Sequence, residues 1–168
     1  MTTVIDVKLA DPNSENPNSV RRAVLTLNKL IQQLMADDLV IPQNVLTSDA
    51  NEDITAGMAV YMNVSGDFCL AKADSTSTSS VIGLAVSDVS SGNSASVISS
   101  GSMVLDDWTD VVGGAELTPG VIYYLSPTTA GLLTSTRPTG SGEVVAPVGI
   151  AESETVLVIR IGSTLLRS

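Results

Sequence analysis

Two stretches of the chain, "ITAGMAVYM" at residues 54–62 and "LTPGVIYYL" at residues 117–125, decide the fold that the sequence predicts. Each places a threonine and a glycine just before a run of apolar residues, and the stretches lie 63 residues apart. A threonine-x-glycine step makes a tight turn into a strand, because glycine adopts backbone conformations that other residues avoid. The match therefore indicates two copies of one turn-and-strand element.

Three further matches occur in the same order along the chain. They pair "GDFCLAKAD" with "GLLTSTRP", "VIGLAVSD" with "PVGIAESE", and "ASVISSGSMVL" with "VLVIRIGSTLL", and in each pair a glycine faces a glycine. The offset stays between 61 and 66 residues. We interpret the matches as two repeated β units, at about residues 50–105 and 115–166. The alternative is two unrelated sheets, because short glycine-bounded strands are common in β domains.

The chain from residue 43 to residue 168 shows one kind of pattern throughout. Short runs rich in valine, isoleucine and threonine are separated at short intervals by glycine, serine, asparagine and proline. Such spacing is typical of an all-β barrel or sandwich and not of alternating strands and helices. The sequence therefore predicts one β-barrel or β-sandwich domain over residues 43–168.

Residues 1–18 are predicted to form an extended N-terminal arm and a linker. The arm begins with an alternating apolar pattern, and "DPNSENPN" comes next, whose prolines and asparagines disfavour regular structure. The apolar residues of the arm are Val4, Ile5, Val7 and Leu9.

Residues 19–36 are predicted to form a helix of about five turns. Apolar residues recur at spacings of four and three, which is a heptad seam, and Asn18 or Ser19 can act as N-cap. A short parallel bundle between identical chains is one interpretation; the a and d residues alone would favour two strands. Ala23 and Leu30 widen the stripe, so packing on the helix's own domain is the alternative. The seam residues are Val20, Val24, Leu27, Ile31 and Leu34.

Composition lowers the expectation of an enzyme. The chain has no histidine and a single cysteine, Cys69, and histidine is the side chain that most often transfers protons near neutral pH. Cys69 lies in the apolar run "FCL", so we interpret it as a small buried side chain and not as a nucleophile. The formal net charge of −10 disfavours binding to nucleic acid.

The segment "VLDDWTDVVGGAE" contains Asp106, Asp107 and Asp110 around the only tryptophan, Trp108. Three carboxylates could bind calcium, but the segment lacks the ligand alternation of a known calcium loop. The alternative is an acidic surface loop that Trp108 anchors to the core or to a neighbouring subunit. A depolymerase would need two carboxylates across a cleft, and nothing in the sequence places two of them so. The remaining candidates are Glu116, Glu143, Glu152 and Glu154.

The N-terminus lacks the basic start and apolar core of a signal peptide, and no apolar run has the length of a membrane span. We therefore expect a soluble protein that is synthesised in a cytoplasm and has no membrane partner.

The blocks "ITAGMAVYM", "VIGLAVSD", "LTPGVIYYLS" and "VAPVGIAESETVLVIRIG" resemble small β-rich virion proteins of tailed bacteriophages. These are head decoration (cement) proteins, head-fibre proteins and related modules of tail fibres. The resemblance covers about residues 50–165. It rests on structural motifs, and these contain no catalytic residue to match.

The resemblance implies a homotrimer on the outer surface of a phage capsid that binds the major capsid protein and stabilises the shell. The arm residues Val4, Ile5, Val7 and Leu9 would contact the capsid, and the β domain would trimerise or project. The helix at residues 19–36 is more similar to the neck of a fibre than to the smallest cement proteins. A tail-fibre or receptor-binding role is the alternative. We expect no catalytic residue, no cofactor and no metal.

Overall fold

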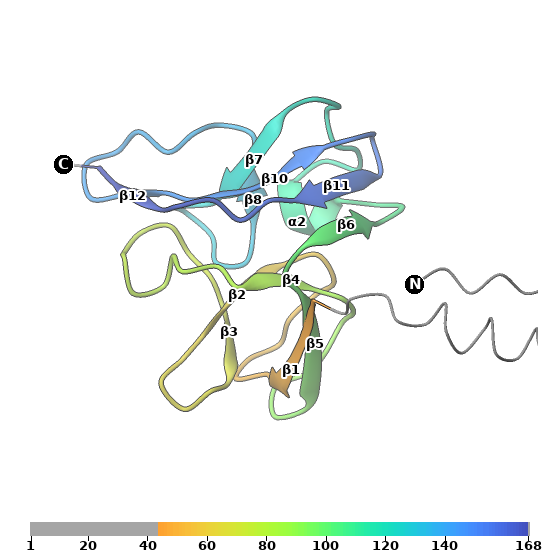
Figure 1. Ribbon diagram of the computed structural model, residues 1–168, viewed down its shortest axis with the longest axis vertical. Helices are drawn as coiled ribbons and strands as arrows, with labels where there is room; N and C mark the ends of the chain where they lie inside the picture. Colours follow the sequence, from red (N-terminus) through yellow and green to blue (C-terminus); the bar gives the residue numbers. More distant parts are fainter. Residues whose placement is uncertain (1–43, 168) are drawn as a thin grey trace, which may run out of the picture. The chain divides into compact units, whose positions relative to one another are not determined.

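Residues 44–167 are described by the computed structural model, and their strands form two five-stranded antiparallel sheets and a short ribbon (Figure 1). The first sheet has the spatial order β1-β5-β4-β2-β3. Its strands are β1 Val45–Asp49, β2 Ala59–Met62, β3 Phe68–Leu70, β4 Gly83–Ala85 and β5 Ser94–Ile98.

The second sheet has the spatial order β6-β11-β10-β7-β8. Its strands are β6 Gly101–Val104, β7 Ile122–Leu125, β8 Leu133–Thr134, β10 Pro147–Ala151 and β11 Val156–Ile159. The single-turn helix α2, Thr109–Val112, comes after β6, and the strands β9 Val144–Val145 and β12 Leu165–Leu166 pair as a separate ribbon. The domain is thus mainly β, and the strands of residues 44–167 do not close into a barrel.

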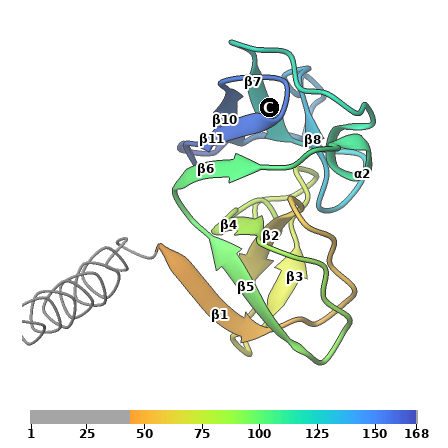
Figure 2. The same ribbon diagram turned by 90° about the vertical axis from the view of Figure 1, so that its right-hand side faces the viewer.

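The two sheets have the same strand order when β1, β2, β3, β4 and β5 are matched with β6, β7, β8, β10 and β11. In each sheet one edge strand, β1 or β6, precedes the other four strands along the chain. Figure 2 shows β5 turning directly into β6. The chain therefore runs from the first sheet straight into an edge strand of the second sheet. Below, "first unit" means residues 45–98 and "second unit" means residues 101–159.

The pairing registers define which residues are equivalent. Val97 pairs with Ala85 and Leu157 pairs with Ala151, and both Val97 and Leu157 are fully buried. The offset at these strands is therefore 60 residues, whereas the sequence match of "ASVISSGSMVL" with "VLVIRIGSTLL" used 61. That last match is wrong in register, because a shift of one residue exchanges the two faces of a strand.

Two glycines allow strands to approach closely at equivalent places. A methyl group on Gly83 would overlap the backbone oxygen of Ile98, and one on Gly149 would overlap the backbone oxygen of Val158. No other residue fits either position without displacing the neighbouring strand.

The threonine-x-glycine steps form the same turn in both units. Gly57 and Gly120 have φ values of 84° and 79°, in the left-handed region that favours glycine. Their N–H groups donate to the carbonyls of Ala85 and Ala151, each at 2.8 Å. Each turn is thus hydrogen-bonded to the central strand of its own sheet, β4 or β10.

Two hydrophobic clusters make up the core. One lies within the first unit, and its buried members are Ala50, Ile54, Val60, Phe68, Ala85, Ala95 and Val97. The other combines residues of both units, among them Ala59 and Leu84 of the first sheet and Tyr123, Leu125 and Leu157 of the second. The central strand β4 of the first sheet is therefore buried on both faces, whereas Leu46 of the edge strand β1 is exposed.

The predicted arm at residues 1–18 and the predicted helix at residues 19–36 lie outside the described residues. Within residues 44–167, no helix has the length and apolar character needed to cross a membrane.

Candidate interaction surface

The site residues predicted from sequence lie outside residues 44–167. They are the seam residues Val20, Val24, Leu27, Ile31 and Leu34 and the arm residues Val4, Ile5, Val7 and Leu9. Both predictions remain predictions. The other candidate segments lie in the β domain, where their surroundings are known.

Trp108 anchors the acidic segment to the core. Its side chain is fully buried, and its indole Nε1–H donates to the carbonyl oxygen of Thr155 at 3.1 Å. Its backbone N–H donates to Ala115 at 3.0 Å. A buried tryptophan with a satisfied N–H contributes a large apolar area to a core. The structure therefore supports the interpretation in which Trp108 anchors the acidic segment to the core.

The carboxylates beside Trp108 have local roles. Asp107 accepts the N–H of Thr109 at 2.8 Å at the start of α2, and hydrogen bonds from Thr109 hold the pKa of Asp107 below its usual range. Asp106 and Asp110 are exposed. Among residues 44–167, no three acidic, cysteine or histidine side chains are grouped so that they could hold a metal ion.

Cys69 is a buried residue of β3, an edge strand of the first sheet. It is buried on β3, opposite Tyr61 of β2, and the Asn63 side-chain amide lies 3.6 Å from its Sγ atom. Burial raises the pKa of the Tyr61 phenol, and the Cys69 thiol beside it raises that pKa further. A thiol in this position contributes to packing.

Among the glutamates considered from sequence, Glu143 has a defined structural contact. Its carboxylate accepts the N–H of Gly140 at 2.7 Å and so stabilises the turn before β9. Glu116, Glu152 and Glu154 are exposed. The backbone carbonyl of Glu154, and not its side chain, binds the N–H of Leu117 at 2.8 Å.

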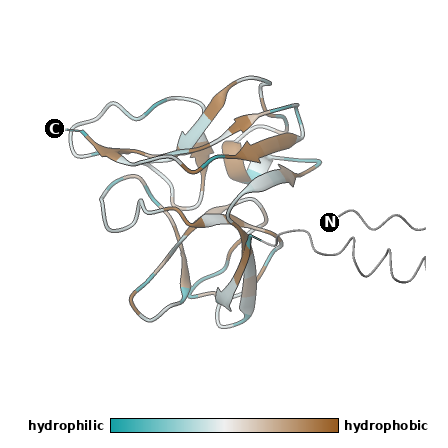
Figure 3. Cartoon of the chain, viewed as in Figure 1, coloured by the Kyte–Doolittle hydropathy of each residue, from teal (hydrophilic) through white to brown (hydrophobic). Residues whose placement is uncertain are grey.

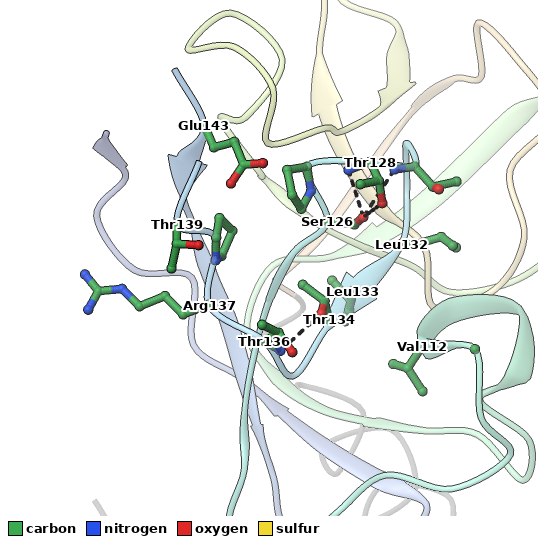
Figure 4. Close-up of a pocket in the computed structure, with 14 residues that line it drawn as sticks. Val112, Ser126, Thr128, Leu132, Leu133, Thr134, Thr136, Arg137, Thr139 and Glu143 are labelled. Carbon is green, nitrogen blue, oxygen red and sulfur yellow. Dashed lines mark hydrogen bonds between the residues drawn. The ribbon is translucent and has the colours of Figure 1, made fainter. Parts of the chain in front are cut away.

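A pocket of about 380 Å³ lies beside β8 and the loop after it (Figure 4). Ser126 is buried at its wall, and its hydroxyl accepts the N–H groups of Thr128 and Thr129, both at 3.2 Å. The exposed side chains at the rim include Thr136, Arg137 and Thr139. Figure 4 shows the Arg137 guanidinium pointing away from the other labelled side chains. The polar groups therefore do not converge on one point, as they do in a typical ligand site.

The outer face of the second sheet is the more informative surface. We call it the open face. It is apolar, and Figure 3 shows β10 and β11 in the brown of hydrophobic residues. Val104 is 61% exposed and Ile122 is 42% exposed. The remaining members are partly exposed. The open face consists of Val104, Ile122, Tyr124, Ile150, Val156 and Val158.

These residues are neighbours across the sheet. Ile150 pairs with Val158 on one side and with Ile122 on the other, and Val156 pairs with Val104. Side chains directly opposite on one face lie within contact distance. The open face is thus a largely apolar surface that spans four strands, with the exposed Ser102 opposite Val158. Contiguous apolar surfaces mark interaction sites.

The equivalent face of the first sheet is covered. Ala59 corresponds to Ile122 and Leu84 corresponds to Ile150 through the matched strands, and both Ala59 and Leu84 are 0% exposed. Both belong to the cluster that contains second-unit residues. The same face of the same strand arrangement is therefore buried in one unit and exposed in the other.

Sequence reasoning did not identify the open face, although a signal was present. "VLVI" at residues 156–159 is apolar at every position and not at alternate ones. A continuous apolar strand is expected to be covered on both faces.

Comparisons with known proteins do not identify the chain. No protein-family model matches it, and no curated protein matches its sequence.

Proposed function

We propose that this chain is a structural protein of a virion that decorates and stabilises the outside of a phage capsid as a homotrimer. The observation that supports a structural role best is the open apolar face on a closely packed β domain. Such a surface fits association with another protein. The phage assignment rests on the resemblance of the sequence blocks to decoration and head-fibre proteins.

In this proposal the β domain consists of two repeats of one unit. The helix at residues 19–36 forms an oligomerising neck, and the arm at residues 1–18 contacts the major capsid protein. A protein that binds only the assembled shell stabilises it by mass action. The proposal gives the chain no catalytic role, cofactor or metal.

The copy number in purified particles tests this function. Quantitative mass spectrometry of the chain relative to the major capsid protein is expected to give a ratio approaching one. A ratio of a small fraction would indicate a fibre at one vertex or at the tail. Absence of the chain from the particle would refute a virion role.

The second candidate is a tail-fibre or receptor-binding module. A host ligand would meet the exposed polar side chains of Thr136, Arg137 and Thr139 at the rim of the pocket beside β8, although these groups do not converge on one point. Removal of residues 1–36 separates the two functions. Attachment to the capsid should be lost, whereas glycan binding by the β domain should survive. Retention of capsid attachment by the truncated chain would contradict the role assigned to the arm.

A further inference from the structure

One charged residue borders the open face at each end. At the first end, Glu152 comes directly after β10, and its N–H donates to the carbonyl oxygen of Val156 at 2.9 Å. Glu152 is therefore opposite Val156 in the ladder between β10 and β11, and residues opposite each other share a face of the sheet. Glu152 is exposed. This end of the open face thus carries a negative charge.

Arg160 lies at the other end. It comes directly after β11, and its N–H continues the ladder by donating to the carbonyl oxygen of Val148 at 2.8 Å. The residues on either side of it, Ile159 and Ile161, pack in the core cluster that combines both units. Because successive side chains of a strand point to opposite faces, Arg160 lies on the outer face in line with Val158. It is exposed, so this end carries a positive charge.

The residues between the two charges are uncharged. The pairing registers join one residue from each of four neighbouring strands into a row that crosses the sheet midway between the charged ends. We call it the middle row, and it consists of Ser102, Val158, Ile150 and Ile122. Among residues 44–167, neither Glu152 nor Arg160 takes part in an ion pair. The open face therefore has an uncharged centre between two opposite charges.

A surface of this kind is complementary to a copy of itself. When a second open face packs on the first with its strands reversed in direction, Glu152 of each copy meets Arg160 of the other, and the two middle rows pack together. Sheets that pack face to face form the core of a β-sandwich, and a two-fold contact needs a self-complementary patch. We propose that the open faces of two copies of this chain pack together about a two-fold axis, with Glu152 and Arg160 paired at both ends of the contact.

The two charges favour this occupant and this orientation. If the strands of both copies ran in the same direction, each carboxylate would face a carboxylate and each guanidinium a guanidinium, and like charges opposite each other are destabilising. A partner that is apolar throughout would bury Glu152 and Arg160 without counter-charges, which is costly. A second copy with reversed strands covers the apolar centre and pairs both charges.

The inference goes beyond the proposed function, because the contact needs neither a capsid nor the helix at residues 19–36. In the proposed function that helix joins the copies of a trimer. The two-fold contact uses the outer face of the second sheet instead. Chains that make both contacts link one trimer to another.

A single-cysteine form of the full chain tests the contact. It carries Cys69→Ala and Val158→Cys, because Val158 belongs to the middle row and meets its own copy across the two-fold axis. Oxidised glutathione is added to the purified protein without capsids, and it is reduced to two thiols as the disulfide between copies forms. We expect a disulfide-linked dimer on non-reducing gels, at least tenfold more abundant than in a matched control. The control carries Val86→Cys in place of Val158→Cys, because Val86 is an exposed valine of the first unit, at 46%.

Charge exchange tests the orientation of the two copies. In the Val158→Cys form, Glu152→Arg places arginines opposite each other, and Arg160→Glu places glutamates opposite each other. Each single exchange should lower the yield of the dimer at least threefold, and the double exchange should restore it. Asp49→Arg is the matched control, because Asp49 is an exposed carboxylate of the first unit. It should leave the yield unchanged.

Folding of every variant is checked by circular dichroism. If Cys69→Ala impairs folding, the series is made with Cys69 retained, since that thiol is buried. If Val158→Cys impairs folding, Ile150→Cys of the same row replaces it.

Two results would overturn the proposal. One is a dimer yield at the level of the Val86→Cys control, which is also the result expected if a different protein covers the open face. The other is a yield that the single charge exchanges do not lower or that the double exchange does not restore. A failed cross-link with a high copy number in particles refutes the two-fold contact alone, and the reverse result refutes the virion role alone.

Discussion

The first and second units share one strand order and one set of turns, yet they bury the same face to different extents. Leu84 is 0% exposed, whereas its equivalent, Ile150, is partly exposed. Gly131 is packed against a neighbouring unit, and its equivalent, Gly66, is not. Repeated local structure therefore sets which residues share a face. Whether that face is buried depends on whether another segment of the chain packs against it.

The units also differ in the segment after their edge strand. Residues 50–53 come after β1, whereas residues 105–116, which include α2, come after β6. From this longer segment, Leu105 and Val111 approach Gly57 of the first unit, to 2.7 and 2.9 Å from the position of a Cβ atom on that glycine. The second unit therefore covers the first with an insertion that the first lacks.

The largest expected effect is the loss of the insertion's anchor. Trp108→Ala should lower the free energy of unfolding by about 3–5 kcal/mol, as is usual for large aromatic side chains in a core. Urea denaturation of the full chain at fixed protein concentration measures it. Trp108→Phe keeps most of the apolar contact and should cost less. A cost below about 1 kcal/mol for Trp108→Ala would show that the insertion does not hold the units together.

The next effect concerns the close strand approaches, which the two units share. Gly83→Ala and Gly149→Ala should each lower the free energy of unfolding by about 1–3 kcal/mol, because the added methyl overlaps a backbone oxygen in both cases. The same urea titration compares them. Nearly equal losses would support the equivalence of the two units. A loss of unfolding free energy at only one of the two glycines would contradict that equivalence.

A smaller effect should separate the two turn glycines. Gly57→Ala and Gly120→Ala both place a side chain at positive φ, so that strain is common to the pair. Only at Gly57 would the methyl also meet Leu105 and Val111, since nothing lies within 4 Å at Gly120. Gly57→Ala should therefore cost about 1 kcal/mol more than Gly120→Ala. Equal losses of unfolding free energy would contradict the covering role of the insertion.

The smallest effect is a pH dependence confined to the first unit. Lys72 Nζ lies 2.9 Å from Asp74 Oδ2, and the hydrogen bond from Lys72 lowers the pKa of Asp74. A lowered folded-state pKa adds stability above the unfolded pKa and loses it as the pH falls through the folded value. Asp74→Asn should cost less than about 0.5 kcal/mol at pH 7, as is usual for exposed pairs.

The control for this pair lies in the second unit. Arg137 and Thr139 occupy the positions equivalent to Lys72 and Asp74, and threonine does not ionise. Thr139→Val should leave the pH dependence unchanged. Unfolding curves measured between pH 7 and pH 3 should show the cost of Asp74→Asn shrinking toward the acid end, and a constant cost would be inconsistent with a role for the charge.

Much of the fold can be predicted from local patterns in the sequence. The prediction of a mainly β domain was correct, because short valine- and isoleucine-rich runs bounded by turn residues are typical of β-strands. Gly57 and Gly120 were identified as turn glycines, and the structure gives both the positive φ that such turns need. The anchoring role that the sequence offered for Trp108 agrees with its full burial.

Other features could not be predicted from local patterns. The last repeat match failed because "VLVI" is apolar at every position, so it does not indicate which residues face the core. The exposed state of Ile122 and Val104 was not predicted, since apolar residues in strands are expected to be buried. The predicted seam from Val20 to Leu34 stays a prediction.

The sequence by itself determined the β character, the turns and the places where strands approach closely, because these depend on the conformations available to glycine and on the spacing of apolar residues. Only the tertiary structure decided which strands are neighbours, which register they adopt and which apolar face stays open. Those properties depend on contacts between residues far apart in the chain. No local pattern records whether another segment arrives to cover a face.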